Sequence, residues 1–334
     1  MRESCFVLGL VLGGFLAASA KADDPWIVYE GKEGPGKGKN IVLIAGDDEY
    51  RSEELIPQLA KVLAVRQGFK CTVLFAINPT TGEIDPATHD NIPGLEALKT
   101  ADLLIMFLRF RDLPDDQMKA IIDYANSGRP IMSLRTNTHP FNFEKHRNGP
   151  YAKWQWNSNG EIKGGFGRHI LGETWVNHYG AHQKESTRGL IADGAKDSPI
   201  VKGCEDIWGP SDVYEITTLN GDCKPIIMGQ VLVGMNPTDG PNTAKKLLPV
   251  AWTRTFTGTE GKAGRIFTTT MGHAGDLQSE GFRRLLVNAA FWGMGMEDKI
   301  PARANVELVG KYDPTPIGGG RHKKGVKPGD LKIE

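Results

Sequence analysis

The sequence predicts an α/β fold built on a doubly wound, mostly parallel sheet. From about residue 40 onward, short continuous apolar segments alternate with segments whose apolar residues recur at helical spacing. Strands that are apolar along their whole length need cover on both faces, and helices that connect parallel strands supply it. The pattern favours a flavodoxin-like arrangement, in which ligands bind beyond the carboxyl ends of the strands.

Four strands are predicted in the first half of the chain. Each is a short continuous apolar run of the kind that forms a buried strand. The runs lie at residues 41–45, 71–77, 101–107 and 130–134. Sheet-like segments resume further on, at residues 226–235, 250–256 and 265–270.

Three helices are predicted from apolar residues at helical spacing. The first begins at Ser52, whose hydroxyl can cap it. The second covers residues 118–125, and Gly128 is expected to stop it. The closing helix carries an apolar stripe over residues 282–290, which we interpret as part of the core.

The N-terminus has the layout of a secretory signal peptide. Arg2 precedes an apolar run at residues 5–16, and small residues lead to a cleavage position after Ala22, or else after Ala20. The run is shorter than the roughly 20 residues of a membrane-spanning helix. We therefore expect residues 1–22 to be removed and the product to be periplasmic or secreted, with no membrane attachment.

The rest of the chain divides into a leader, a domain and an extension. Residues 23–39 form a polar leader, in which the glycine-rich run 31–38 imitates a phosphate-binding loop but lies on the wrong side of the first strand. The α/β domain covers residues 40–297. An irregular insertion at about 137–221 is expected to form functional loops over the strand ends. Residues 298–334 are expected to wrap the domain and then fray.

Composition limits the partners and the covalent cross-links. The chain has 40 Lys and Arg and 40 Asp and Glu, so its formal net charge is zero. This balance argues against a nucleic-acid partner. It leaves open the possibility that the protein forms a homo-oligomer. Beyond the signal, Cys204 and Cys223 could close one disulfide, and Cys71 is expected to be a buried thiol.

Two histidines are expected at strand ends, where the ligand crevice of such a sheet lies. His273 follows the strand at 265–270, directly before a predicted helix. His139 follows the fourth strand, with Arg135 and Asn137 before it as candidate substrate-binding residues. A histidine there suits acid–base work or oxyanion contact, although either could instead cap a turn.

A second pair of histidines lies within the insertion. His178 and His182 are four residues apart, so on a helix both imidazoles would lie on one face, as in zinc sites. The glutamate of the usual zinc motif is missing, however. The alternative is a sugar site in which Trp175 or Tyr179 stacks on the sugar ring.

Two aspartates complete the candidate set. Asp47 follows the first strand, where a carboxylate could bind sugar hydroxyls or a metal, or could complement the dipole of the next helix. Asp212 lies in the insertion, three residues before Glu215, and could orient the histidines or pair with Arg135.

Several of these segments resemble the trehalose-utilisation (ThuA-like) family. The similar stretches lie at residues 41–48, 130–141, 211–214, 249–252 and 264–273, within a region of roughly 40–297. The resemblance implies a class I glutamine-amidotransferase-like fold without the amidotransferase cysteine, and a role with trehalose-like or 3-keto sugars. It also places His139 and His273 at the family's strand-end positions and His182 in its Gly/His loop.

These observations predict an exported enzyme that acts on a keto-glycoside by isomerisation or glycoside cleavage. His139 or His182 would be the base, because a carbonyl acidifies the neighbouring proton, with Asp47, Asp212 and His273 positioning it or binding metal. One alternative is a carbohydrate-binding protein without catalysis. The other is a metal-dependent hydrolase with zinc on His178 and His182.

Overall fold

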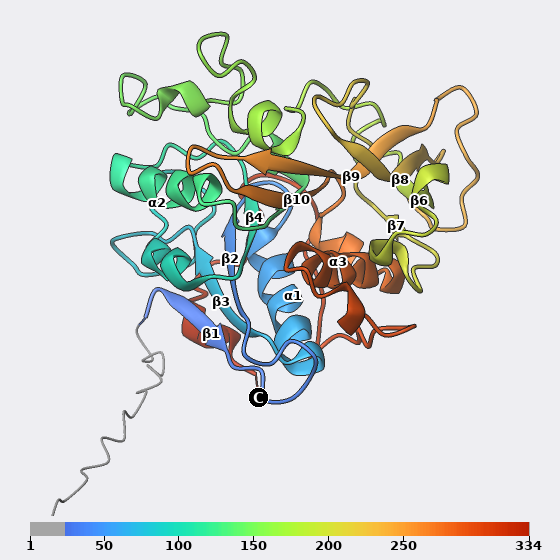
Figure 1. Ribbon diagram of the computed structural model, residues 1–334, viewed down its shortest axis with the longest axis horizontal. Coiled ribbons are helices and arrows are strands. Elements are labelled where there is room, and N and C mark those ends of the chain that lie inside the picture. The colour runs from blue at the N-terminus through green and yellow to red at the C-terminus, as the bar shows by residue number, and fades with distance from the viewer. Residues whose placement is uncertain (1–23, 334) are drawn as a thin grey trace, which may run out of the picture.

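Five parallel strands form the centre of a ten-stranded sheet (Figure 1). In their order across the sheet they are β3 (Lys70–Phe75), β2 (Asn40–Gly46), β4 (Leu103–Leu108), β5 (Ile131–Leu134) and β10 (Ala263–Thr269). The computed structural model describes residues 24–333, so the predicted signal peptide at residues 1–22 lies outside the described residues. Because parallel strands end at the same edge, their carboxyl ends present a common surface for a site.

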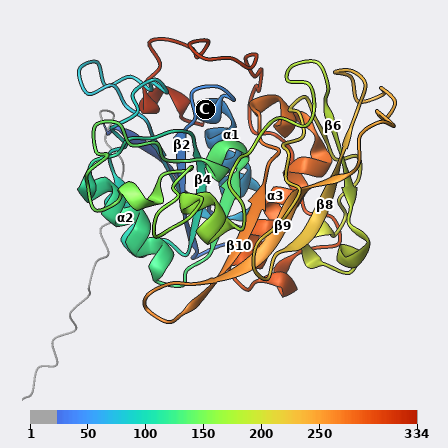
Figure 2. The same ribbon diagram turned by 90° about the horizontal axis from the view of Figure 1, so that it is seen from above.

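Antiparallel strands flank this parallel core on both sides. They are β1 (Trp26–Tyr29) beside β3, and β9 (Leu248–Thr257), β8 (Lys224–Val231), β6 (Thr187–Ile191) and β7 (Trp208–Gly209) beyond β10. Figure 2 shows β10, β9 and β8 side by side, extending the sheet away from α2. The predicted mostly parallel sheet therefore describes the core only, and β1, β6 and β7 were not expected.

Helices cover both faces of the core. The helices α1 (Ser52–Gln67) and α3 (Glu280–Gly293) pack on one face, and α2 (Asp115–Asn126) packs on the other with the short η1 (Leu95–Thr100). Figure 1 shows α2 and α1 on opposite sides of β2 and β4. The α/β class is confirmed.

The described helices were also compared with the length and hydrophobicity of a membrane-spanning helix. Within residues 24–333, none of them meets both requirements.

The insertion after β5 is built mainly from turns and short helices, and it also contains β6 and β7. The short helices of the chain beyond η1 are η2 (Arg135–Thr138), η3 (Ala152–Trp154), η4 (Gly167–Leu171, a π-helix), η5 (Asp193–Ala195), η6 (Pro199–Val201), η7 (Ala274–Gln278), η8 (Glu297–Lys299) and η9 (Pro328–Leu331). His178 and His182 lie on none of them, so the helix considered for this pair is wrong. His178 instead forms an isolated β-bridge with Tyr214, which joins two distant parts of the insertion.

The helix α1 begins at Ser52 as predicted, but its cap differs from the prediction. Arg51 occupies the cap position in a left-handed conformation, with φ of 63°. The Ser52 hydroxyl does not cap the helix. It accepts the Asp47 N–H at 2.8 Å and thereby closes the tight turn between β2 and α1. This turn places the backbone of residues 47–50 at the carboxyl edge of the sheet.

The glycine-rich leader packs closely against the end of α1. A Cβ atom added to Gly31 would lie 2.2 Å from the carbonyl carbon of Gly68. Gly68 itself ends α1 in the left-handed region, with φ of 84°, which glycine adopts most readily. Gly31 and Gly34 therefore serve close backbone packing, and Gly36 packs against the ring of Phe69.

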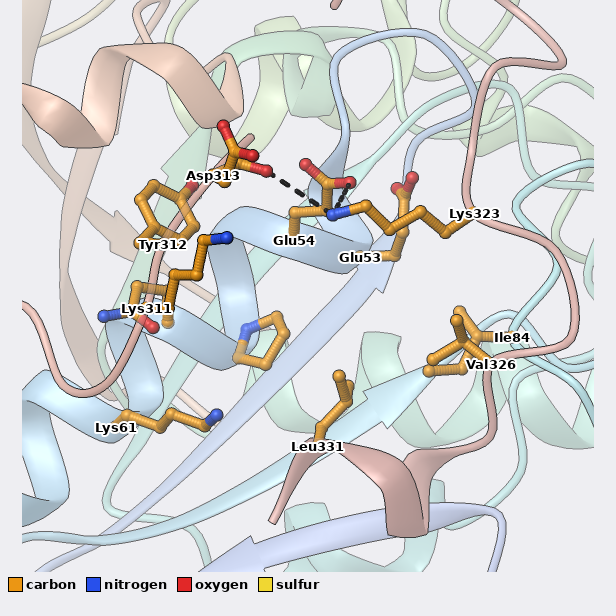
Figure 3. Close-up of a pocket in the computed structure, with 12 residues that line it drawn as sticks. Glu53, Glu54, Lys61, Ile84, Lys311, Tyr312, Asp313, Lys323, Val326 and Leu331 are labelled. Atoms are coloured by element: carbon orange, nitrogen blue, oxygen red, sulfur yellow. Dashed lines mark hydrogen bonds and ion pairs between the residues drawn. The ribbon is translucent and has the colours of Figure 1, made fainter. Parts of the chain in front are cut away.

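The C-terminal extension returns across α1 and the edge of the sheet. The Tyr29 hydroxyl donates to the carbonyl of Leu331 at 2.7 Å, and the Ile84 N–H donates to the carbonyl of Val326 at 2.8 Å. Side chains of the last dozen residues thus pack on the core, and the expected fraying is wrong for residues 323–333. A pocket of about 180 Å³ remains between α1 and this extension (Figure 3).

The described cysteines are all free thiols. Cys71 is fully buried, as expected. Cys204 and Cys223 do not pair, so the disulfide considered for them is not formed. Cys204 packs instead near α3, where its thiol lies 3.5 Å from the carbonyl oxygen of Ile200.

Glu53 is a buried carboxylate beside the pocket of Figure 3. Neither of its oxygens accepts a hydrogen bond from the described residues, and its nearest cation is the Arg51 Nη1 atom at 3.5 Å. Burial raises the pKa of Glu53 from 4.5 to about 8, against the opposing effect of Arg51. When folding raises the pKa of a carboxyl group, the folded state loses stability as the pH rises from the pKa of the unfolded chain to the pKa of the folded chain.

We therefore expect Glu53→Gln to gain stability relative to the wild type between about pH 5 and about pH 8.5. The expected gain in the free energy of unfolding is about 2 kcal/mol, because each pKa unit corresponds to about 1.4 kcal/mol and relaxation absorbs part of the shift. Urea unfolding at both pH values measures it, with the exposed Glu96→Gln as control. A difference between Glu53→Gln and wild type that stays constant with pH would contradict the prediction.

Candidate functional site

The candidate site is organised around the carboxylate of Asp212, which is 1% exposed. Its Oδ1 atom accepts from Arg135 Nη2 at 2.8 Å and from His182 Nδ1 at 3.0 Å, and its Oδ2 atom accepts from His178 Nδ1 at 2.7 Å. Burial opposes ionisation, but Arg135 and the two histidines outweigh it and hold the pKa of Asp212 well below its usual range. Asp212 is therefore an anion that orients two imidazoles.

Arg135 holds Asp212 in place. The guanidinium is fully buried and lies between the rings of Tyr50 and Tyr214, at 4.4 and 3.8 Å from their centroids. Its Nη1 atom also donates to the carbonyls of Asp212 and Thr270, both at 2.6 Å. Because Arg135 has no exposed atom, it cannot contact a ligand directly, and its role is to hold Asp212 in position. The sequence had favoured it as a substrate contact.

His178 has the geometry of a general base. Its Nδ1–H donates to Asp212, which fixes the tautomer and leaves Nε2 as the atom with a free lone pair. Nε2 has no hydrogen-bond partner among residues 24–333, and the side chain is 31% exposed. A carboxylate that holds an imidazole in this way is a common feature of proton-transfer sites.

His182 lies between two carboxylates. Its Nδ1 atom is 3.0 Å from Asp212 Oδ1, and its Nε2 atom is 3.3 Å from Glu49 Oε1. The hydrogen bonds to Asp212 and then to Glu49 raise the pKa of His182 to about 9, so it is a cation at neutral pH. This geometry favours an electrostatic role for His182 over the role of base.

His139 forms part of an apolar wall. It is 3% exposed, and its Nδ1 atom lies 3.1 Å from the Thr138 hydroxyl. Burial, followed by the charges of Arg109 and Arg135, lowers the pKa of His139 well below its usual range. A neutral imidazole that is nearly closed to solvent is a poorer base than His178, because a base must reach the substrate.

Aromatic rings surround this wall. The ring of Trp175 lies 5.3 Å from that of His139 and 5.8 Å from those of His178 and Trp156, and Phe110 lies 5.7 Å from Trp156. We call Phe110, Trp156 and Trp175 the aromatic wall. All three are half-buried, and the Trp175 indole N–H has no partner in the described part of the chain. Such rings can stack on the apolar face of a sugar.

Two predicted site residues instead stabilise turns. The Asp47 carboxylate is fully buried and accepts the N–H groups of Glu49 and Tyr50 and the Thr136 hydroxyl. Burial, followed by the charge of Asp48, raises its pKa. Asp47 thus ties the end of β2 to the end of β5.

His273 caps η7 at the end of β10. Its Nδ1 atom accepts the Gly275 N–H at 3.0 Å, and its Nε2 atom lies 3.3 Å from the carbonyl oxygen of Thr315. Burial lowers the pKa of His273 to about 4. Both ring nitrogens are engaged, so we assign His273 a structural role, although its place at a strand end predicted a functional histidine.

Asn137 and Tyr179 also have structural partners. Asn137 is fully buried and links the ends of β4 and β5, accepting from the Leu108 N–H at 3.3 Å and donating to the Ser133 hydroxyl at 3.0 Å. The Tyr179 hydroxyl accepts the Lys246 N–H at 2.8 Å. Neither side chain belongs to the aromatic wall.

Sequence reasoning missed Arg109, Phe110 and Asp276. Arg109 and Phe110 follow β4, and the rule that drew attention to the ends of β2 and β5 would have found them. Asp276 follows His273 closely, and its buried carboxylate accepts from the Ser211 N–H at 3.0 Å and the Gly272 N–H at 2.7 Å. It therefore fixes the segment that carries Asp212.

The two histidines and the aspartate at the centre of the candidate site could also hold a metal ion. His178, His182 and Asp212 each offer a ligand atom, and these atoms lie within 4.8 Å of one another. Imidazole and carboxylate ligands suit zinc. Arg135 also contacts the same carboxylate, however, and its positive charge opposes a second cation there.

Comparisons with known proteins identify the family. A family model described as trehalose utilisation (ThuA) matches residues 63–293, which is more than half of the chain, and the chain belongs to this family. The resemblance seen in the sequence is confirmed. A search of the curated proteins found no match.

Two solved structures match this chain. A ThuA-like protein from Parabacteroides merdae ATCC 43184 matches 89% of this chain and 100% of its own, at 14% identity and a TM-score of 0.50. One from Bacteroides uniformis ATCC 8492 matches 78% of this chain and 92% of its own, at 16% identity and a TM-score of 0.46. At these identities the first likeness concerns the fold alone.

Proposed function

We propose that this protein is a carbohydrate-processing enzyme that acts on trehalose-like or 3-keto sugars by acid–base chemistry. Family membership points to a carbohydrate-related role. The observation that carries the proposed reaction is the pair of contacts that Asp212 makes with His178 and His182 beside the aromatic wall. The imidazole of His178 keeps a free lone pair on Nε2, and the imidazole of His182 is positively charged.

The proposed reaction begins with proton abstraction beside the sugar's carbonyl. The Nε2 atom of His178 takes the proton, the C–H electrons move toward the carbonyl oxygen, and an enediolate forms. The positive charge of His182, whose ring centroid lies 4.7 Å from that of His178, stabilises this anion. Transfer of the hydroxyl proton between the two enediolate oxygens, with return of the abstracted proton to the former carbonyl carbon, gives isomerisation. Expulsion of the glycosidic oxygen, with its protonation, gives cleavage.

The fold supports a reaction site at the carboxyl ends of the parallel strands. We propose that it is the doubly wound, flavodoxin-like sheet of the glutamine-amidotransferase-like class, because the parallel strands follow the order β3-β2-β4-β5-β10 with helices on both faces. Residues 47–50, 109–110 and 135–139 follow the carboxyl ends of three neighbouring strands. The signal-like residues 1–22 further support the proposal that the enzyme is exported.

The test of this function is turnover of 3-keto-disaccharides by the mature chain. We expect an isomerised or cleaved product, detected by chromatography and NMR, from the keto forms and none from the unmodified sugars. Binding of these sugars without any product would instead favour a carbohydrate-binding protein without catalysis.

A second candidate function is metal-assisted chemistry, favoured by the proximity of His178, His182 and Asp212. These residues would hold the ion, and a divalent metal such as zinc would polarise the carbonyl oxygen. We place it second because Arg135 already neutralises Asp212.

We accordingly expect the purified protein to contain well under one zinc per chain, and chelation to leave turnover unchanged. Elemental analysis and assays before and after EDTA treatment measure both. One metal per chain, with activity that EDTA removes and zinc restores, would establish the metal-assisted alternative.

A further inference from the structure

A polar cleft of about 730 Å³ opens beside the candidate site. Its lining includes Asp48, His89, Arg109, Phe110 and Asn142, and we call it the Arg109 cleft. Its volume is in the range of pockets that bury an organic ligand. None of the site residues predicted from the sequence lines it, and the proposed reaction makes no use of it.

A chain of ion pairs joins the cleft to the site. Arg109 contacts Asp48 at 2.8 Å on the cleft side and Glu49 at 3.0 Å on the other. Glu49 in turn contacts His182 at 3.3 Å. A ligand in the cleft would therefore contact Arg109, which pairs with the carboxylate that contacts His182.

Phe110 belongs both to the aromatic wall of the candidate site and to the lining of the Arg109 cleft. Its φ of 49° lies in the left-handed region, which is unusual for a residue with a side chain. The conformation is held by a hydrogen bond of 3.1 Å from the Phe110 N–H to the carbonyl of His139. It places the ring on the cleft wall and 4.9 Å from the ring of His139.

Most of the charged side chains that line the cleft are paired, whereas the exposed carboxylate of Glu144 forms no ion pair with the described residues. Asp48 pairs with Arg109 and lies 3.4 Å from His89, and Asp90 pairs with Lys145 at 2.5 Å. A paired carboxylate retains lone pairs that accept from hydroxyl groups, and the cations retain N–H groups that donate to them. The cleft therefore suits a neutral ligand rich in hydroxyl groups, since an anion would meet the carboxylates and a cation would meet the arginine and lysine.

We propose that the Arg109 cleft is a subsite for further neutral sugar residues, so that the preferred substrate is an oligosaccharide longer than a disaccharide. The aromatic wall holds the reacting sugar, and the chain continues past Phe110 into the cleft. This inference rests on the proposed function and specifies its substrate class.

The experiment compares a 3-keto glucose disaccharide with the corresponding tri- and tetrasaccharide. The wild type is expected to have a kcat/KM about tenfold higher on the trisaccharide, equivalent to one or two added hydrogen bonds. His89→Ala and Asn142→Ala together are expected to remove this advantage and leave the disaccharide unchanged. Lys311→Ala, in the pocket of Figure 3, is the control.

Equal kcat/KM values for all lengths in the wild type would overturn the proposal, as would an equal loss on every length in the double variant. If no keto sugar reacts, the proposed function has failed, and the cleft is tested by calorimetry with unmodified glucose oligosaccharides. Affinity that rises with length in the wild type but not in the double variant supports the subsite. Affinity that is absent or independent of length overturns it.

Discussion

His178→Gln is expected to lower kcat on a 3-keto-disaccharide by about 100-fold or more, which is the usual contribution of a general base. The amide can still hydrogen-bond to Asp212, but it cannot take up a proton. Because Nδ1 of His178 is held at 2.7 Å by that buried carboxylate, no other imidazole in the described chain offers Nε2 in the same position. Steady-state kinetics measures the loss.

The matched control for this variant is His146→Gln. His146 is also partly exposed, and its Nδ1 atom also lies close to a carboxylate, that of Asp112 at 2.8 Å. It lies outside the Asp212 cluster, so its replacement is expected to leave disaccharide turnover within about twofold of wild type. Similar losses in both variants, or near-normal activity of His178→Gln, would remove His178 from the role of base.

Asp212→Asn is expected to damage both stability and activity. Without the carboxylate, the guanidinium of Arg135 becomes a buried charge without its counter-ion, which typically costs about 3–5 kcal/mol. An asparagine can retain a hydrogen bond to Arg135, so we expect a value of about 3 kcal/mol. The amide can also stabilise the wrong tautomer of His178, and kcat should fall by about 100-fold or more.

Denaturant unfolding and kinetics test the two effects of Asp212→Asn separately. Glu215→Gln is the control, because this half-buried carboxylate makes no hydrogen bond to the described residues. It should remain within about 0.5 kcal/mol of wild type. A fully stable, active Asp212→Asn protein would contradict the central place given to this carboxylate.

The core of the fold could be predicted from the sequence because its signals are local. Continuous apolar runs and helical periods identified β2 to β5, β10 and the three helices. The strands β6 and β7 were missed because β6 is largely half-buried and β7 has only two residues. Neither has the unbroken apolar pattern that marks a buried strand.

The roles of the site residues could be predicted less well, because partners distant in sequence determine them. The local sequence places His273 at a strand end and His178 in the irregular insertion, and neither position shows which histidine keeps a free ring nitrogen. The cap on Gly275 and the carbonyl of Thr315, 42 residues away, engage both nitrogens of His273. Asp212, 34 residues from His178, leaves one nitrogen of that ring free.

Arg135 illustrates the same limit. Its place before His139 at a strand end indicated a ligand contact, since strand ends line the crevice. The rings of Tyr50 and Tyr214, which enclose the guanidinium, come from segments far before and far after Arg135 in the sequence. Only the folded chain brings them together, so only the structure distinguishes a supporting arginine from a binding one.

The most direct test of the account is solvent exchange at the carbon next to the sugar's carbonyl. In D₂O, NMR should show wild-type enzyme exchanging this proton of a 3-keto-disaccharide, with the exchange lost in His178→Gln and retained in His146→Gln. That result is predicted if Nε2 of His178 removes the proton. Product formation without any exchange in wild type, or exchange that persists in His178→Gln, would contradict the proposed proton transfer.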